Sequence, residues 1–358
     1  MAASNSNKAG LLRCSSLHGG SPAIRHLNPQ MSDMLLLFDY PSVRDLKEGR
    51  HVSGYPAALL AMAMRYAECT SVQMDTFLPE PPRFNNPSAF FHPKKNCPND
   101  AVGNPIHHKW GHLRSDLMPH LQRIRQRCKE APLVLALGDL SLWALTGDKL
   151  SDHRGTILYA EGGLRVIGSH NPRSIIKDQS LLPVLSMDLK KAWQESLKPR
   201  SVFPRRTMHI IESLADMRRA TQRILGGTQF AFDIETAQQQ VTMICFAPSP
   251  HEVYVLPFWF HTHNFWDEDT ELQMWLEVQR LMASPLRKVA HNAVYDLTYL
   301  MEMGLRIRFP VDDTMLKSHS NEIEWLKSLG FLGSIYCNEK SWKNMRVGKV
   351  KDRNKKDE

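Results

Sequence analysis

The chain has 358 residues and a mass of 41.0 kDa, which is too long for one ordinary domain and sufficient for two. It is 42% hydrophobic and 23% charged, and it contains no apolar run of about eighteen residues, so a membrane span is excluded. The six cysteines are widely spaced and form no C-x-x-C pair. This usage argues against a disulfide framework and a zinc ribbon, and it predicts a reducing, cytoplasmic location.

The net charge of +8 lies in the two ends of the chain. Residues 1–30 carry +3 and residues 340–358 carry +5, so the body between them is formally neutral. Basic ends raise non-specific affinity for phosphates, but they do not define a shaped site. Residues 1–30 are rich in Ser, Asn and Gly and predict a disordered leader; an organellar presequence and an internal start at Met31 are the alternatives.

Residues 31–198 predict one α/β domain in which apolar strands alternate with helices. Strands are expected at 34–38, 133–137, 157–159 and 164–167. Helices are expected at 55–66, 117–128, 140–145 and 181–197. The proline-rich stretch 78–105 predicts a long loop, and His107, His108 and Trp110 beyond it are expected to pack at the surface.

A short basic linker, residues 199–206, leads to a second predicted domain at 207–338 and a basic tail at 339–358. Three strands are expected to form an antiparallel meander at 230–234, 241–246 and 252–258. They are followed by a helix at 271–282, a strand at 288–292, a helix at 293–303, a strand at 306–309 and a helix capped by Asp313. This order of elements is that of a ribonuclease-H-like layer.

Two acids one residue apart end the first of these strands, in the sequence F-A-F-D-I-E-T at 230–236. Because side chains alternate along a strand, Asp233 and Glu235 are expected to point the same way. Two carboxylates side by side repel each other, and Mg²⁺ or Mn²⁺ would relieve that repulsion. The alternative is a strand end at which both acids simply reach water.

A third acid follows in K-V-A-H-N-A-V-Y-D-L-T-Y-L at 288–300, where Asp296 lies one turn into the predicted helix. The apolar stripe of this helix is expected to consist of Val294, Leu297 and Leu300, which leaves Asp296 off the core face. Together with Asp233 and Glu235, it predicts a two-metal site that hydrolyses phosphodiesters.

These segments, with D-D-T-M-L at 312–316, resemble the first two motifs of the DEDD-type 3′–5′ exonucleases. The resemblance is strongest to the proofreading domain of phage-type family A DNA polymerases, and it covers about 225–342. It implies that Asp233, Glu235 and Asp296 are catalytic metal ligands for Mg²⁺ or Mn²⁺. It further implies removal of 3′-terminal nucleotides from single-stranded or frayed DNA during replication. The residues implied to contact DNA are Thr236, His291, Asn292 and Tyr295.

The third motif of that family is not found. It holds a Tyr and, four residues later, an Asp, whereas after Trp342 this chain has no Tyr and only Asp352 and Asp357 in a Lys-rich tail. The chain is therefore expected to stop before the last catalytic element and to be completed by a separate polymerase polypeptide. A truncated reading frame and a non-catalytic, DNA-binding replisome subunit are the alternatives. If the protein is phage-encoded, the expected location is the host cytoplasm or nucleoid.

The first domain resembles the uracil-DNA glycosylase superfamily, which has a three-layer α/β fold, over about 33–197. The resemblance is carried by L-L-L-F-D-Y-P at 35–41, L-V-L-A-L-G-D at 133–139 and I-G-S-H-N-P-R at 167–173. It implies that Asp39, His170 and Asn171 are the loop residues of that family's site. Tyr40 and the two residues after it replace the family's glycine-rich first loop, so a degenerate, non-catalytic DNA-handling module is expected. An active uracil glycosylase is the alternative.

Overall fold

The computed structural model describes residues 33–260, 263–323, 325–337 and 339. The predicted leader and nearly all of the predicted basic tail lie outside these residues. The chain divides into two compact units, one comprising the residues up to Val202 with those from Gly333 onward, the other Phe203–Leu332. Among the described residues, none of the helices combines the length and the apolar character that a membrane span requires.

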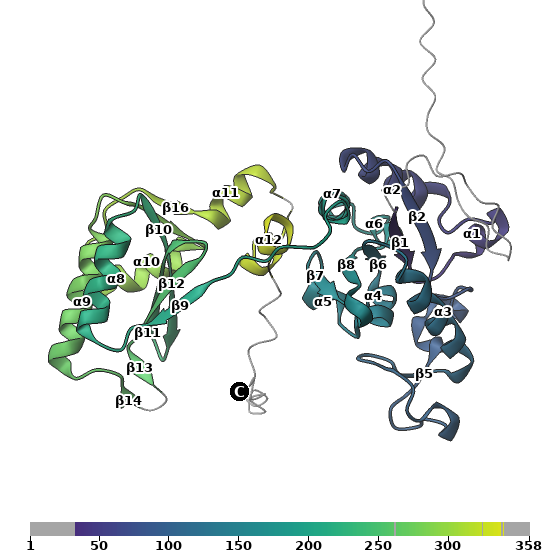
Figure 1. The fold of residues 1–358 in the computed structure, drawn as a ribbon, viewed down its shortest axis with the longest axis horizontal. Coiled ribbons are helices and arrows are strands. Elements are labelled where there is room, and N and C mark those ends of the chain that lie inside the picture. Colours follow the sequence, from purple (N-terminus) through teal and green to yellow (C-terminus); the bar gives the residue numbers. More distant parts are fainter. Residues whose placement is uncertain (1–32, 261–262, 324, 338, 340–358) are drawn as a thin grey trace, which may run out of the picture. The chain divides into compact units, whose positions relative to one another are not determined.

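The first unit is built on a mixed five-stranded sheet with the order β2-β1-β6-β8-β7 (Figure 1). Its strands are β1 Met34–Phe38, β2 Val72–Thr76, β6 Val134–Leu137, β7 Ile157–Tyr159 and β8 Arg165–Ser169. All neighbouring pairs are parallel except that of β7 with β8. Every residue of β1 and β6 is buried, as expected for parallel strands that are covered on both faces.

Helices cover both faces of this sheet. They are α1 Val43–Glu48, α2 Gly54–Tyr66, α3 Met118–Cys128, α4 Asp139–Thr146, α5 Leu150–His153, α6 Pro172–Ile175 and α7 Leu181–Ser196. Leu35 and Leu37 join a buried cluster with α3 and α4, so the alternate side chains of β1 face the other layer, where α7 packs. The four strands and four helices expected in this part are confirmed to within a few residues.

Several elements of the first unit were not expected. β2 and α1 were missed because their segments are short and only partly apolar. A small sheet, β3-β5-β4, joins Phe91–His92 within the predicted loop to Gly111–Leu113 and Ile106–His107, which follow that loop in the chain. Short 3₁₀ turns also occur, at Arg83–Asn85, Pro87–Phe90, Asn99–Ala101, Ser115–Leu117 and Glu161–Gly163.

Residues 333–337 belong to the first unit through a polar contact with α7. The Lys191 ammonium donates to the backbone carbonyls of Gly155, Ser334 and Cys337, each at 2.8 Å. One cation thus satisfies three carbonyl groups, two of them at the end of α12, Leu329–Tyr336.

The second unit contains a six-stranded sheet with the order β16-β15-β10-β11-β12-β9. Its strands are β9 Thr207–Ile210, β10 Gln229–Ala237, β11 Gln240–Ser249, β12 Glu252–Pro257, β15 Arg287–Ala290 and β16 Val311–Asp313. The meander β10-β11-β12 is antiparallel as predicted, and β15 and β16 continue the sheet in parallel with β10. A separate two-stranded ribbon joins β13 Trp259–Phe260 to β14 His263–Asn264.

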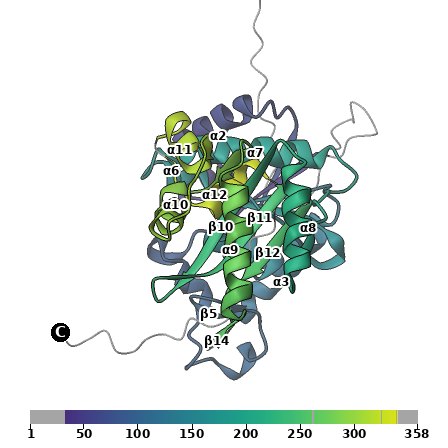
Figure 2. The same cartoon turned by 90° about the vertical axis from the view of Figure 1, so that its left-hand side faces the viewer.

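One face of this sheet carries the core of the unit. Phe230, Phe232 and Ile234 point from β10 into a cluster with α8 Leu214–Leu225 and α9 Glu268–Met282, and the two helices lie side by side across the strands (Figure 2). The remaining helices are α10 Ala293–Glu302 and α11 Thr314–Asn321. The alternate residues of β10, Asp233 and Glu235 among them, face away from this core.

Two predictions in the second unit are wrong. Residues 306–309 form no strand, because Arg306 N and Arg308 N bond to α9 instead, and the strand comes later, at β16. Val294 is 65% exposed and does not belong to the apolar stripe of α10, which buries Ala293 and Leu300. The prediction of a cap at Asp313 is confirmed. β9 and α8 had not been predicted.

Candidate active site

Asp233 and Glu235 lie on the outward face of β10, as their spacing predicted. Asp233 is paired across the ladder with Cys245 of β11, and the register shifts immediately afterwards, between Glu235 and Thr236. Such bulges re-aim side chains next to them. The local fold therefore presents two carboxylates at an irregular point of an otherwise regular strand.

Asp296 lies beside these acids through a bond to the backbone of β10. β15 pairs with β10 only as far as Ala231, and beyond it Asp296 Oδ1 accepts a 2.9 Å hydrogen bond from Ile234 N. The carboxylate thus replaces a strand carbonyl as acceptor, at the residue that follows Asp233 in the chain. Its side chain was expected off the core face, yet the residue is only 3% exposed because it fills the gap between α10 and β10.

The pKa values of the acids reflect this proximity. Burial raises the pKa of Asp296 to about 6, with the Ile234 N–H opposing the shift and Asp233 adding to it. Desolvation also raises the pKa of Asp233, with repulsion from Glu235 adding to it and His291 opposing it. Carboxylates that repel one another in this way can together bind a hard divalent cation, which would relieve the repulsion.

Asp313 is a fourth acid near the group, and its carboxylate accepts hydrogen bonds from four backbone N–H groups. Oδ2 accepts from Ala293 N at 2.8 Å, and Oδ1 accepts from Asn292 N at 3.1 Å, Met315 N at 2.8 Å and Leu316 N at 3.3 Å. One buried carboxylate therefore caps the N-termini of both α10 and α11. By holding the start of α10, Asp313 positions Asp296 one turn later.

Two residues expected to contact nucleic acid lie against each other at the edge of the site. Tyr295, in the first turn of α10, has its hydroxyl 2.6 Å from Thr236 Oγ1, and its side chain is 45% exposed. Because Thr236 follows Glu235 and Tyr295 precedes Asp296, this bond links the two segments that carry the acids. The geometry leaves an aromatic surface open beside them.

Asn292 and His291 are placed differently. Asn292 adopts a left-handed conformation with φ 63°, which Asn tolerates, and its exposed side chain makes no capping bond. His291 Nε2 donates to the carbonyl of Lys327 at 2.8 Å, and Nδ1 lies 2.9 Å from Thr314 Oγ1. Both ring nitrogens of His291 are therefore engaged internally.

In the first unit, Asp39 lies directly after β1, at the carboxyl edge of the sheet. Its Oδ1 accepts from Ser141 N at 2.7 Å, and burial raises its pKa to about 6. Gly138 has φ 140°, and a Cβ there would lie 2.2 Å from Asp39 Oδ2. Glycine is thus required for α4 to begin against this carboxyl group.

His170 and Asn171 follow β8 at the same edge. Asn171 is fully engaged, since Nδ2 donates to Leu137 O at 3.0 Å and Oδ1 accepts from Arg173 N at 3.0 Å. Burial lowers the pKa of His170. Arg173 in turn donates to Tyr40 O at 2.7 Å and pairs with Asp45, so these loops are tied to one another.

One polar cluster was missed from the sequence. His107 Nε2 and His108 Nε2 lie 3.4 and 3.5 Å from the same atom, Asp139 Oδ2. The expectation that His107 packs at the surface is wrong, because it is fully buried and stacks on Trp110 at 4.2 Å. Lys109 N donates to His107 Nδ1 at 3.2 Å, which places the proton of neutral His107 on Nε2, facing Asp139. The three side chains lie close enough together to hold a metal ion, but in this tautomer His107 Nε2 carries a proton and cannot coordinate one.

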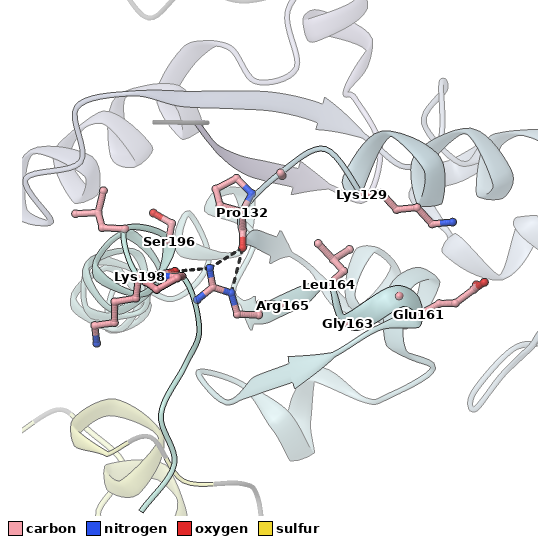
Figure 3. A pocket seen from close by; sticks show the side chains of 12 residues that line it. Lys129, Pro132, Glu161, Gly163, Leu164, Arg165, Ser196 and Lys198 are labelled. Carbon is pink, nitrogen blue, oxygen red and sulfur yellow. Dashed lines mark hydrogen bonds between the residues drawn. The ribbon is translucent and has the colours of Figure 1, made fainter. Parts of the chain in front are cut away.

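A cavity of about 710 Å³ opens elsewhere in the first unit, near the amino ends of β6 and β8 (Figure 3). Arg165 lies in its wall and donates to the backbone carbonyls of Pro132, Glu195 and Lys198 at 2.8–3.1 Å. The guanidinium is thus occupied in joining the end of α7 to the sheet. None of the sequence-predicted site residues lines this cavity.

Neither a family model nor a curated protein matches the chain. Solved structures similar to it include Escherichia coli RNase D, an exoribonuclease, at 13% identity over 39% of this chain and 36% of that one, with a TM-score of 0.31. The Aedes aegypti Nibbler EXO domain is 13% identical over 42% of this chain and 82% of its own, with a TM-score of 0.31. The catalytic core of Trypanosoma brucei RRP6 is 18% identical over 55% and 53%, with a TM-score of 0.32.

The chain thus spans about a third of the length of E. coli RNase D and about half of the RRP6 core. TM-scores this low do not establish a shared fold. The interpretation of the site therefore depends on its own geometry.

Proposed function

We propose that the second unit is a metal-dependent 3′–5′ exonuclease domain with a ribonuclease-H-like fold. Asp233, Glu235 and Asp296 are the metal ligands and catalytic residues in this proposal. The observation that supports it is the bond of the Asp296 carboxylate to Ile234 N, which brings this acid to Asp233, whose charge in turn meets that of Glu235 on the exposed face of β10. Like charges placed close together lower the stability of a fold, so such a group is expected where a cation binds or a reaction takes place.

The donor set fits Mg²⁺ or Mn²⁺, since both prefer carboxylate oxygens. When bound in a two-metal site, such ions activate water and stabilise the leaving 3′ oxygen of a phosphodiester. The chain's own residues orient the acids: Asp313 fixes the first turn of α10, and the Thr236–Tyr295 bond ties that turn to the strand end. The exposed side chains of Tyr295 and Asn292 would face the terminal nucleotide.

The proposed substrate is the single-stranded or frayed 3′ end of DNA, as in replication proofreading. This choice is supported by the resemblance of F-D-I-E-T and H-N-A-V-Y-D-L to the exonuclease motifs of phage-type DNA polymerases. A separate polymerase polypeptide would supply the Tyr and Asp of the third motif. In the absence of that partner, turnover by this chain is expected to be slow.

The test uses the full chain with 5′-labelled single-stranded DNA and, in parallel, single-stranded RNA of the same sequence. We expect shortening of the DNA from its 3′ end in Mn²⁺, none in chelator, and loss of the activity in Asp233→Asn. Asp269→Asn, an exposed acid of α9 beneath the opposite face of the sheet, is the matched control. Undiminished Mn²⁺-dependent shortening by Asp233→Asn would refute the site, and shortening of RNA alone would refute the choice of DNA.

A non-catalytic, DNA-binding subunit is the alternative for the same chain. It predicts binding of DNA that does not depend on a divalent cation, and no shortening in any metal until a polymerase partner is added. Isothermal titration of the native chain and of Asp233→Asn with Mn²⁺ alone separates the two proposals. The nuclease proposal predicts that Mn²⁺ binds the native chain but not the variant, whereas the alternative predicts no such difference.

A second candidate function, base excision by the first unit, is favoured by one observation. Asp39 has its pKa raised to about 6 at the carboxyl edge of the sheet, which suits a general base. This activity would create abasic sites in uracil-containing DNA in the presence of EDTA and would be lost in Asp39→Asn. Intact uracil-containing DNA after incubation with the full chain would exclude it.

A further inference from the structure

Phe84, in the loop that follows β2, is the most exposed large apolar residue of the described chain. Its side chain is 99% exposed, whereas the next most exposed residue of this kind, Ile323, reaches 68%. An aromatic ring that is wholly exposed to water contributes none of the stabilisation that burial of apolar surface usually provides. Exposure alone does not assign a function to a residue.

The backbone holds Phe84 in a conformation that phenylalanine avoids. Its φ of 55° and ψ of 26° are left-handed, a region in which a bulky residue is an outlier, and Asn85 follows at φ 54°. Such strain persists only where the surroundings enforce it, and it concentrates at functional sites. Glycine or asparagine would take this conformation with less strain, so the aromatic residue is retained at a loss of stability.

The loop that enforces this conformation is braced on both sides. Asn85 N donates to Pro82 O at 3.1 Å, and Asn86 N donates to Arg83 O at 3.1 Å. The Asn86 side chain then accepts from Ser88 N at 3.1 Å, and Pro82 is buried. The ring is therefore presented on a short, proline-bounded turn, which lowers the entropy lost when it binds something.

The position of the loop in the sheet adds a second argument. β2 runs parallel to β1, with Thr76 opposite Phe38, so the chain leaves β2 at the same edge where Asp39 follows β1. In open α/β sheets, ligands bind at the carboxyl ends of the strands. The segment that carries Phe84 therefore leaves the sheet at the edge where such ligands bind.

We propose that Phe84 stacks on an unpaired base of single-stranded nucleic acid and that the adjacent Arg83 contacts its phosphate backbone. An apolar pocket of a protein partner, or a lipid surface, would require more apolar residues at the tip. Here the ring is flanked only by exposed Arg83, Asn85 and Asn86, an arrangement of one aromatic with cationic and amide groups that suits bases and phosphates. The proposal concerns the first unit and does not depend on the nuclease site.

The test measures binding of a fluorescent single-stranded oligonucleotide containing 2-aminopurine to the full chain in EDTA, where no nuclease can act. We expect Phe84→Leu to weaken binding about 5- to 100-fold, the range for loss of one base–aromatic stack, and to abolish the quenching of 2-aminopurine. Phe84→Trp should retain both. Tyr159→Ala removes a half-exposed aromatic at the end of antiparallel β7, hence at the opposite edge, and should leave binding unchanged.

Phe84→Gly keeps the proposal testable against a purely structural role. Because glycine tolerates the left-handed backbone, this variant should lose affinity while its melting temperature stays equal or rises. A fall in melting temperature would show that the ring packs in solution and would overturn the proposal. Binding by Phe84→Leu as tight as that of the native chain would overturn it as well, since a stacking role needs the aromatic ring. Because binding is measured in EDTA, its outcome is separate from that of the Mn²⁺-dependent nuclease assay.

Discussion

Replacing Asp296 by asparagine should stabilise the metal-free protein while abolishing its metal binding. The amide oxygen of the new side chain can still accept from Ile234 N, so the bond that closes the site is kept. What is lost is a buried negative charge facing Asp233. The substitution therefore isolates the electrostatic cost of assembling the acids.

The magnitude follows from the raised pKa of Asp296. A folded-state value of about 6 against an ordinary value of 3.8 corresponds to about 3 kcal/mol of stability lost once the group is ionised. Because the folded state holds the proton more tightly, the native chain loses this stability as the pH rises from about 4 to above 6. Below about pH 4 the group is protonated in both the folded and the unfolded states, so the variant gains nothing there.

The assay is urea unfolding of the full chain at pH 4 and pH 7.5, in EDTA and in Mn²⁺. We expect Asp296→Asn to be more stable than the native chain by up to about 3 kcal/mol at pH 7.5 and equally stable at pH 4. Mn²⁺ should raise the stability of the native chain and not that of the variant. Asp312→Asn is the control with the opposite sign, since hydrogen bonds from Lys317 and Arg287 hold the pKa of Asp312 below its usual range.

A variant that is less stable at pH 7.5 in EDTA would show that the carboxylate is not repelled by its neighbours. An equal gain from Mn²⁺ in both proteins would show that Asp296 is not a ligand. Either result would refute the reasoning that joins the three acids into one site.

Three further substitutions test the scaffold. Asp313→Ala removes the cap shared by α10 and α11 and should destabilise the protein by about 2–4 kcal/mol in urea unfolding, whereas a loss under about 0.5 kcal/mol would contradict the shared cap. Gly138→Ala combines a φ of 140° with a Cβ against the Asp39 carboxyl group and should lower stability by about 2 kcal/mol or more; an unchanged melting temperature would show that α4 does not begin as described. Lys191→Met leaves three carbonyls without their donor, so hydrogen exchange at 333–337 should become faster than in Lys190→Met, and equal protection in the two variants would exclude the contact.

Local patterns in the sequence determined most of the elements and half of the site. The apolar run of β1 and the alternation in F-A-F-D-I-E-T suffice to predict buried strands and to put Asp233 and Glu235 on one face, because the strand period is two residues whatever lies around it. The same local reasoning found the cap at Asp313. It did not find that this carboxylate also caps α10, since that bond joins residues 20 apart in the chain.

Only the tertiary structure decided how the third acid lies and which residues are left in water. Asp296 reaches Ile234 N because β15 stops pairing with β10 at Ala231, and no pattern within α10 records where a neighbouring strand ends. Helical spacing likewise placed Val294 in the core, although it is 65% exposed, and gave no sign that Phe84 is unburied. Periodicity fixes the direction of a side chain relative to its own element. The burial of a side chain and its interactions with other charges depend on which other helices and strands pack against it. Those contacts form between segments that are distant in the chain.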